Sequence, residues 1–104
     1  MGTPRKEAEC LVIGTGIAGA TCALMAARMG IRVCLITKRS DIFATNTNRA
    51  QGGIVYRGNG DTVEMLVADI IRAGRGINSA EAVEFLAEKG PDVVKEVLID
   101  DLKV

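Results

Sequence analysis

The segment 14–19, Gly-Thr-Gly-Ile-Ala-Gly, is the feature that most constrains how this chain folds. It follows an apolar run at 9–13 that does not alternate with polar residues, which predicts a parallel strand buried on both faces. Apolar residues at helical spacing follow over 17–29, and Gly30 predicts a left-handed end to that helix. A second apolar run at 32–37 completes a strand–helix–strand unit with a right-handed crossover, so the expected fold class is α/β.

The three glycines meet separate requirements of a nucleotide-binding turn. Gly14 lets the chain turn off the strand, and Gly16 lets the backbone approach a diphosphate. Gly19 and Ala23 let the helix lie near the sheet. The first N–H groups of the helix have no partners within it, and the helix dipole adds partial positive charge there. We therefore expect the turn to bind a dinucleotide; the alternative is a purely structural glycine turn.

The end of the second strand departs from an ordinary NAD site. A dinucleotide fold usually has an acidic residue there that binds a ribose hydroxyl. This chain has Thr37-Lys38-Arg39 instead, and the nearest carboxylate is that of Asp41. The departure disfavours NAD. The two basic side chains, taken alone, are compatible with the 2′-phosphate of NADP.

A polar segment at 38–61, rich in turn-forming residues, follows the second strand. A loop of this length is unusual inside a compact domain unless it holds a ligand, so we expect it to contact one. The apolar run 54–56, Ile-Val-Tyr, interrupts it as a candidate short strand.

Three amphipathic helices are expected after this loop. Asp61 and Glu64 have the spacing of a capping box at the start of the first, and Gly74 can end it. Either residue of the pair 78–79, Asn-Ser, caps the second helix. Pro91 follows a glycine and is expected in the first turn of the third.

The composition excludes several classes of function. The chain has no histidine, which removes the Ser-His triad and the histidine metal ligand. Its 13 basic and 13 acidic residues give no net field for nucleic acid. The cysteines stand twelve residues apart without a CxxC pair, which predicts reduced core thiols and no metal site (Cys10, Cys22, Cys34). No apolar stretch is long enough for a membrane span and the polar opening is no secretory signal, so we expect a cytoplasmic protein.

The most specific signal lies beyond the second strand. The dipeptide 37–38, Thr-Lys, followed by the segment 46–54, Asn-Thr-Asn-Arg-Ala-Gln-Gly-Gly-Ile, resembles the succinate dehydrogenase and fumarate reductase flavoprotein family, in which this loop wraps FAD. The likeness continues at 67–69, 73–76 and 81–86, and so covers most of 9–100. It implies a Rossmann-like FAD-binding βαβ unit with additional helices, as an incomplete part of a larger parallel-sheet flavoprotein domain.

The resemblance also implies which residues contact FAD. They comprise the glycine turn, the lysine at the strand end and the wrapping loop: Gly14, Thr15, Gly16, Ile17, Ala18, Gly19, Lys38, Asn46, Thr47, Asn48, Ala50, Gln51, Gly52 and Gly53. Arg49 holds a variable position in the family loop, and we interpret it as a surface arginine.

One position in the loop separates branches of the family. Members that tether FAD covalently have a histidine where this chain has Asn46. The resemblance therefore implies that FAD is bound noncovalently, and in this the chain is similar to the branch that oxidises L-aspartate. That branch passes a hydride from L-aspartate to FAD, forms iminoaspartate, and is reoxidised by dioxygen or fumarate. Its product feeds quinolinate and NAD synthesis, and the same analogy implies association with quinolinate synthase. The alternatives are a soluble flavoprotein like fumarate reductase or succinate dehydrogenase, and a truncated nucleotide-binding fragment without activity.

The substrate-binding and catalytic residues of the family fall beyond residue 104, as does the domain that caps the substrate. No residue of this chain is therefore assigned a catalytic or metal-binding role. We expect 1–104 to be the amino-terminal part of an FAD-binding domain, with the capping domain outside it.

Overall fold

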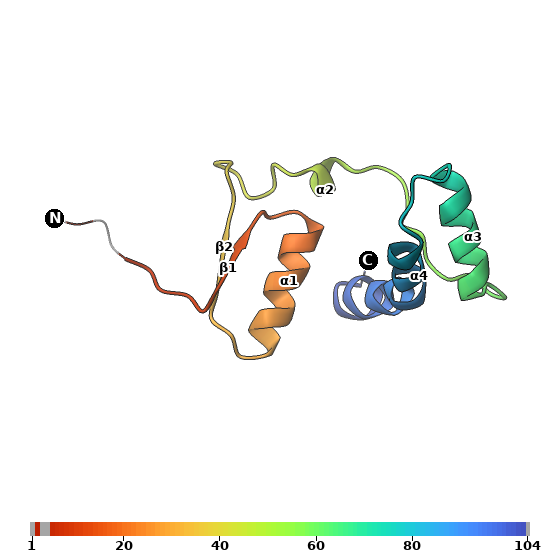
Figure 1. Cartoon of the computed structure of the whole chain (residues 1–104). Coiled ribbons are helices and arrows are strands. Elements are labelled where there is room, and N and C mark those ends of the chain that lie inside the picture. The colour runs from red at the N-terminus through yellow and green to blue at the C-terminus, as the bar shows by residue number, and fades with distance from the viewer. Residues whose placement is uncertain (1, 3–4, 104) are drawn as a thin grey trace. The chain divides into compact units, whose positions relative to one another are not determined.

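The computed structural model describes residues 2 and 5–103, and shows a mixed α/β chain (Figure 1). The polar opening at 1–7 lies partly outside these described residues. The chain divides into two compact units, residues 1–52 and 53–104, and each is described by itself.

The first unit is built on the predicted strand–helix–strand sequence. Strand β1 (Cys10–Ile13) and strand β2 (Val33–Ile36) pair in parallel, with Cys10 opposite Val33 and Ile13 opposite Ile36. Helix α1 (Ile17–Arg28) connects them, and Gly30 follows it with φ +80°. The two strands, the helix and its left-handed end are therefore confirmed.

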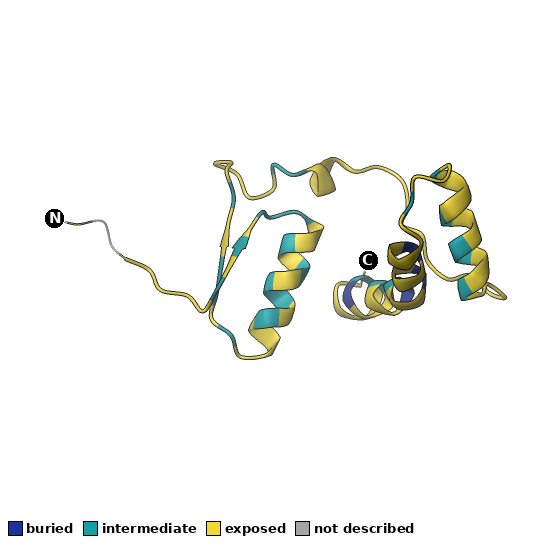
Figure 2. Ribbon diagram, viewed as in Figure 1, coloured by how far each residue is buried: buried dark blue, intermediate teal, exposed yellow. Residues whose placement is uncertain are grey.

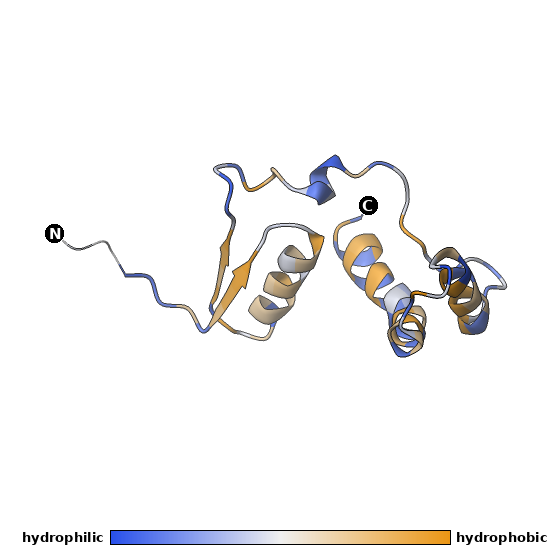
Figure 3. Ribbon diagram, turned by 45° about the horizontal axis from the view of Figure 1, so that its top comes forward, coloured by the Kyte–Doolittle hydropathy of each residue, from blue (hydrophilic) through white to orange (hydrophobic). Residues whose placement is uncertain are grey.

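The expected burial of the strands on both faces is wrong for this unit. Cys10 and Val12 of β1 are half-buried on the side of α1, whereas Leu11 and Ile13 are 57% and 78% exposed. Figure 2 shows the strands without any buried residue, and Figure 3 shows how apolar they are. The reason is that the described sheet has two strands and one packed helix, so only one face is covered.

The loop that follows β2 contains an element that the sequence pattern did not indicate. Residues Asn46–Arg49 form the short helix α2, which Thr45 caps: its side chain accepts a hydrogen bond of 3.1 Å from the backbone N–H of Asn48. Residues 54–56, in contrast, form no strand. Apolar residues alone do not form a strand when no neighbouring strand accepts their backbone hydrogen bonds, so that expectation is wrong.

The second unit consists of helices α3 (Val63–Ala73), α4 (Ala80–Val94) and the π-helix η1 (Lys95–Asp101). Helix α3 packs against α4, and α4 packs against η1. The buried residues of the described chain are on α4 and η1, where they form the core of this unit: Val83, Ala87, Pro91 and Val97 (Figure 2).

The cap of α3 lies one residue later than predicted. The Thr62 side chain accepts a hydrogen bond of 3.2 Å from the backbone N–H of Met65, whereas the Asp61 carboxylate accepts one of 2.7 Å from Gly58 and so closes the preceding turn. Hydrogen bonds from its own backbone N–H and from Thr62 lower the pKa of Glu64. Thr62 caps the helix because the Asp61 carboxylate already accepts a hydrogen bond in the preceding turn.

The segment between α3 and α4 shows which residue caps the second predicted helix. Gly74 ends α3 as expected, in the right-handed region with φ −79°. Ser79 caps α4 by accepting a hydrogen bond from Ala82, while the Asn78 amide donates one of 3.2 Å back to the carbonyl of Ile70.

Pro91 does not start a new helix, contrary to expectation. It lies inside α4, where it continues the buried stripe of Val83 and Ala87 at four-residue spacing. A proline inside a helix loses one backbone hydrogen bond, and burial of this stripe offsets that loss. The backbone then widens into η1, whose hydrogen bonds span five residues, as from the Leu102 N–H to the Val97 carbonyl at 3.1 Å.

We predict that Gly90→Ala stabilises the chain. Gly90 lies inside α4, and a Cβ there would meet Leu86 Cδ1 at 3.5 Å, an ordinary van der Waals contact. Alanine loses less backbone entropy than glycine on folding, so the free energy of unfolding should rise by about 0.5–1 kcal/mol. Urea denaturation measures this change, and an unchanged or lower value would contradict the described course of α4.

The ion pair of η1 predicts a loss of stability at alkaline pH. Lys95 Nζ lies 2.6 Å from Asp100 Oδ2, and this hydrogen bond and charge raise the pKa of Lys95 above its ordinary 10.5. The pair therefore stabilises the fold fully below the unfolded-state pKa and loses its effect as pH rises through the raised one. A double-mutant cycle of Lys95→Met and Asp100→Asn should give a favourable coupling free energy at pH 8 that vanishes near pH 12. Equal coupling at both pH values would contradict the pairing.

Candidate cofactor-binding site

A cavity of about 510 Å³ opens in the first unit, where β1 and β2 both end. The carboxyl ends of parallel strands are the usual place for ligands in open α/β sheets. Its lining comes from the glycine turn, the strand ends and the loop with α2: Ile13, Gly14, Thr15, Gly16, Thr37, Lys38, Arg39, Ala44, Thr45, Asn46, Thr47 and Arg49.

The turn between β1 and α1 depends on two glycines. Gly14 has φ +116°, which side chains disfavour, and its N–H donates a 2.8 Å hydrogen bond to the carbonyl of Ile36, the last residue of β2. A Cβ on Gly19 would lie 1.9 Å from the Gly14 carbonyl oxygen and 3.4 Å from Val12 Cγ1. Helix α1 therefore crosses the strand end at a distance that only glycine allows.

The first turn of α1 is capped from a distant part of the chain. Its N-cap residue, Gly16, has no side chain to accept a hydrogen bond, and Thr47 Oγ1 accepts one of 3.0 Å from the N–H of Ile17 instead. A Cβ on Gly16 would lie 3.3 Å from the same oxygen, so the two segments are in close contact. The N–H groups of Ala18 and Gly19 have no acceptor in the preceding turn of the helix and are suited to bind an anion.

A second hydrogen bond ties the same loop to the glycine turn. Thr15 Oγ1 donates to the carbonyl of Ile42 at 2.7 Å, five residues before the Thr47 contact. Together the two bonds hold both ends of the segment 42–47 against the turn. The resulting wall of the cavity is built from segments about thirty residues apart in the sequence.

The charge of the lining is of one sign. Lys38, Arg39 and Arg49 line the cavity, and no Asp or Glu is among its lining residues. The nearest carboxylate in sequence, that of Asp41, accepts a 2.9 Å hydrogen bond from the Phe43 N–H. Donor N–H groups, hydroxyls and cations in one cavity can bind a phosphate ester.

The predicted residues fall into three groups. The cavity brings together six of them: Gly14, Thr15, Gly16, Lys38, Asn46 and Thr47. Ile17, Ala18 and Gly19 belong to the first turn of α1 beside it. The remaining ones, Asn48, Ala50, Gln51, Gly52 and Gly53, are exposed and do not line it.

Several lining residues were not among those predicted. Thr37 and Arg39 flank the predicted Lys38, so the strand-end signal extends to both neighbours. Thr45 precedes the short helix α2 and could have been found from its capping position. Arg49 was interpreted as a surface arginine; it is exposed, yet it lines the cavity.

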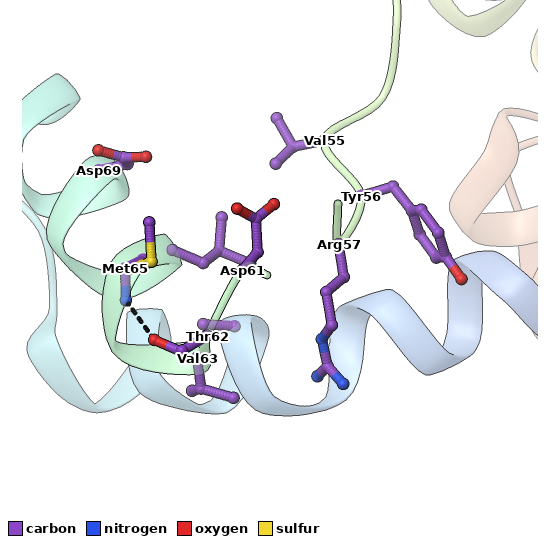
Figure 4. A pocket seen from close by; sticks show the side chains of 10 residues that line it. Val55, Tyr56, Arg57, Asp61, Thr62, Val63, Met65 and Asp69 are labelled. Carbon is purple, nitrogen blue, oxygen red and sulfur yellow. Dashed lines mark hydrogen bonds between the residues drawn. The ribbon is translucent and has the colours of Figure 1, made fainter. Parts of the chain in front are cut away.

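The second unit has smaller hollows of different character. One of about 100 Å³ lies at the start of α3, with Arg57, Asp61 and Asp69 among its lining residues (Figure 4). In the part of the chain that the structure describes, no three His, Cys, Asp or Glu side chains gather as metal ligands.

Known proteins resemble this chain over the region that contains the cavity. The sequence pattern of the FAD binding domain family matches residues 9–99. An L-aspartate oxidase of Streptomyces coelicolor is 37% identical over 92 residues, which are 88% of this chain and 16% of that protein. Those of Mycobacterium tuberculosis and Halobacterium salinarum are 38% and 40% identical, over 90% and 98% of this chain and 18% and 20% of theirs.

The chain thus spans a fifth or less of the length of these curated relatives. No solved structure matches it. Among the described residues, no helix is both long enough and apolar enough to cross a membrane.

We predict that the Thr47 hydroxyl stabilises the first unit. Thr47→Val removes the acceptor of the Ile17 N–H and should lower the free energy of unfolding by about 1 kcal/mol, the typical value of a helix cap. Thr47→Ser keeps the oxygen and should retain most of it. Urea unfolding of the two variants measures the difference, and equal losses would show that the methyl group matters rather than the hydrogen bond.

Proposed function

The chain belongs to the FAD binding domain family, and from this we propose that it is the amino-terminal FAD-binding segment of an L-aspartate oxidase. The observation that carries the proposal is the meeting of the glycine turn, the strand-end Lys38 and the loop 44–49 around one cavity. The alignments with the relatives named L-aspartate oxidase cover 88–98% of this chain.

The residues present suit FAD. We infer that the N–H groups of Gly16, Ala18 and Gly19 bind its diphosphate, with Thr15 and Thr47 holding the walls in place. Lys38 and Asn46 line the same cavity and supply a cation and a carboxamide to the ligand. The loop residues Asn48, Ala50, Gln51, Gly52 and Gly53 are proposed to contact FAD farther from the diphosphate, and their exposure leaves their backbone accessible to it.

The fold supports the same assignment. A parallel β1–β2 pair joined by α1, with the turn at the strand ends, supports a Rossmann-like βαβ unit. We propose that 1–104 is the amino-terminal part of a larger FAD-binding domain and that a capping domain closes the substrate site outside it. The exposed face of the two strands, with Ile13 78% exposed, is consistent with further strands and helices packing there.

The cofactor is proposed to be noncovalent. The loop position at which covalent members of the resembling family carry histidine is Asn46, whose carboxamide is not a nucleophile, and the chain contains no histidine. When bound, FAD would supply the hydride acceptor, and the residues of this chain would bind and orient it.

The whole protein is proposed to oxidise L-aspartate to iminoaspartate, with dioxygen or fumarate as the electron acceptor. The relatives named L-aspartate oxidase support this substrate. We place the reaction in the cytoplasm, consistent with the free thiols of Cys10, Cys22 and Cys34, and upstream of quinolinate formation in NAD synthesis, where association with quinolinate synthase would pass the unstable imine on.

Paired glycine variants test the proposed site. Gly14 and Gly60 have φ +116° and +83°, values that side chains disfavour, and a Cβ at either would meet no atom within 4 Å, so Gly14→Ala and Gly60→Ala each strain the backbone without causing a clash. Gly14→Ala alone should raise the Kd for FAD, by about tenfold, because of these two glycines only Gly14 lines the cavity. Flavin fluorescence titration measures the Kd.

Three outcomes would contradict the proposal. Equal effects of the two substitutions on FAD binding would place the cofactor elsewhere. Flavin that stays with the chain after acid precipitation would contradict a noncovalent link. For the whole protein, turnover of succinate without turnover of L-aspartate would overturn the substrate assignment.

A further inference from the structure

The cations at the cavity are unbalanced by any anion of the lining. The chain as a whole has 13 basic and 13 acidic residues, yet Lys38, Arg39 and Arg49 line this cavity without an Asp or Glu. In the described residues, neither the Arg39 nor the Arg49 guanidinium has a hydrogen bond or ion pair within the protein. The site therefore carries a local positive charge that an anionic ligand can neutralise.

Arg49 is held at this place by the contacts of its helix. It is the last residue of α2, which begins after the Thr45 cap. Thr47, two residues earlier, accepts the hydrogen bond from the Ile17 N–H that fixes this segment beside the glycine turn. The backbone that carries the Arg49 side chain is thus anchored to the first turn of α1.

We propose that Arg49, together with Arg39, binds phosphate oxygens of the ADP half of the cofactor and is a specificity-determining residue of this site. This inference rests on the proposed function, since it takes the cavity to hold the FAD diphosphate. An arginine presents a planar fork of N–H donors that matches two oxygens of one phosphate, which lysine does not. The two guanidinium groups would thus recognise the cofactor through its phosphates, because the strand end of this chain has no carboxylate to bind a ribose hydroxyl.

The charge arrangement also distinguishes between ligands. Adenosine and riboflavin carry no phosphate and gain nothing from the two arginines, whereas ADP and FAD do. Because both side chains are exposed, each contact is partly screened by solvent and by salt. The preference for phosphate-bearing ligands should therefore weaken as ionic strength rises.

The test compares single variants that each remove one positive charge. Arg49→Gln and Arg39→Gln are examined beside Arg57→Gln, which removes an arginine that lines the separate hollow of the second unit. Titration calorimetry with FAD, ADP and adenosine gives the Kd for each. We expect each cavity variant to weaken FAD and ADP by about two- to fivefold, the range of one exposed ion pair, with adenosine unchanged. Arg57→Gln should match wild type, and Arg49→Lys should recover part of the loss.

The outcomes separate this inference from the proposed function. Wild-type chain that binds FAD while Arg49→Gln and Arg39→Gln behave like Arg57→Gln would overturn the arginine assignment alone. Wild-type chain that binds neither FAD nor ADP would overturn both. If adenosine 2′,5′-bisphosphate binds more tightly than ADP and Arg39→Gln abolishes that preference, the arginines recognise a 2′-phosphate and the diphosphate assignment is wrong.

Discussion

The contact between the start of α1 and the end of β1 is the constraint on which the first unit depends. A side chain at position 19 would lie 1.9 Å from the carbonyl oxygen of Gly14, so the helix backbone passes the strand end with no room for a methyl group. This proximity directs the first turn of α1 towards the ends of both strands. The N–H groups of that turn that have no partner within the helix therefore lie beside the strand ends, where open α/β sheets usually bind their ligands.

The local patterns of the first unit were predictable because each depends on neighbours in sequence. The apolar runs at 9–13 and 32–37, the helical spacing between them and Gly30 all have short-range causes, and the strands, helix and turn formed as expected. The cavity was only half predictable. The hydrogen bonds of Thr15 to Ile42 and of Thr47 to Ile17 join residues 27 and 30 positions apart, and no local pattern indicates such partners.

The second unit shows how competition between groups defeats a pattern. Asp61 has the right spacing for a cap, but its carboxylate already accepts the Gly58 N–H, and Thr62 caps α3 instead. Pro91 was expected to begin a helix because proline favours a first turn, yet the buried stripe with Val83 and Ala87 runs straight through it. In both cases the wrong expectation came from treating one residue without the partner that decides its position.

The register of the sheet has a consequence for how this unit assembles. Cys10 lies opposite Val33, so the two strands meet after the chain closes a segment of modest length, most of which is the connecting helix. The entropy cost of closing a loop grows only slowly with its length, so pairing strands across this helix costs little more than closing a shorter loop would. The glycine turn therefore takes its place as the strands pair, and the contacts of 42–47, which join residues 27 and 30 positions apart, complete the cavity wall at a similar entropic cost.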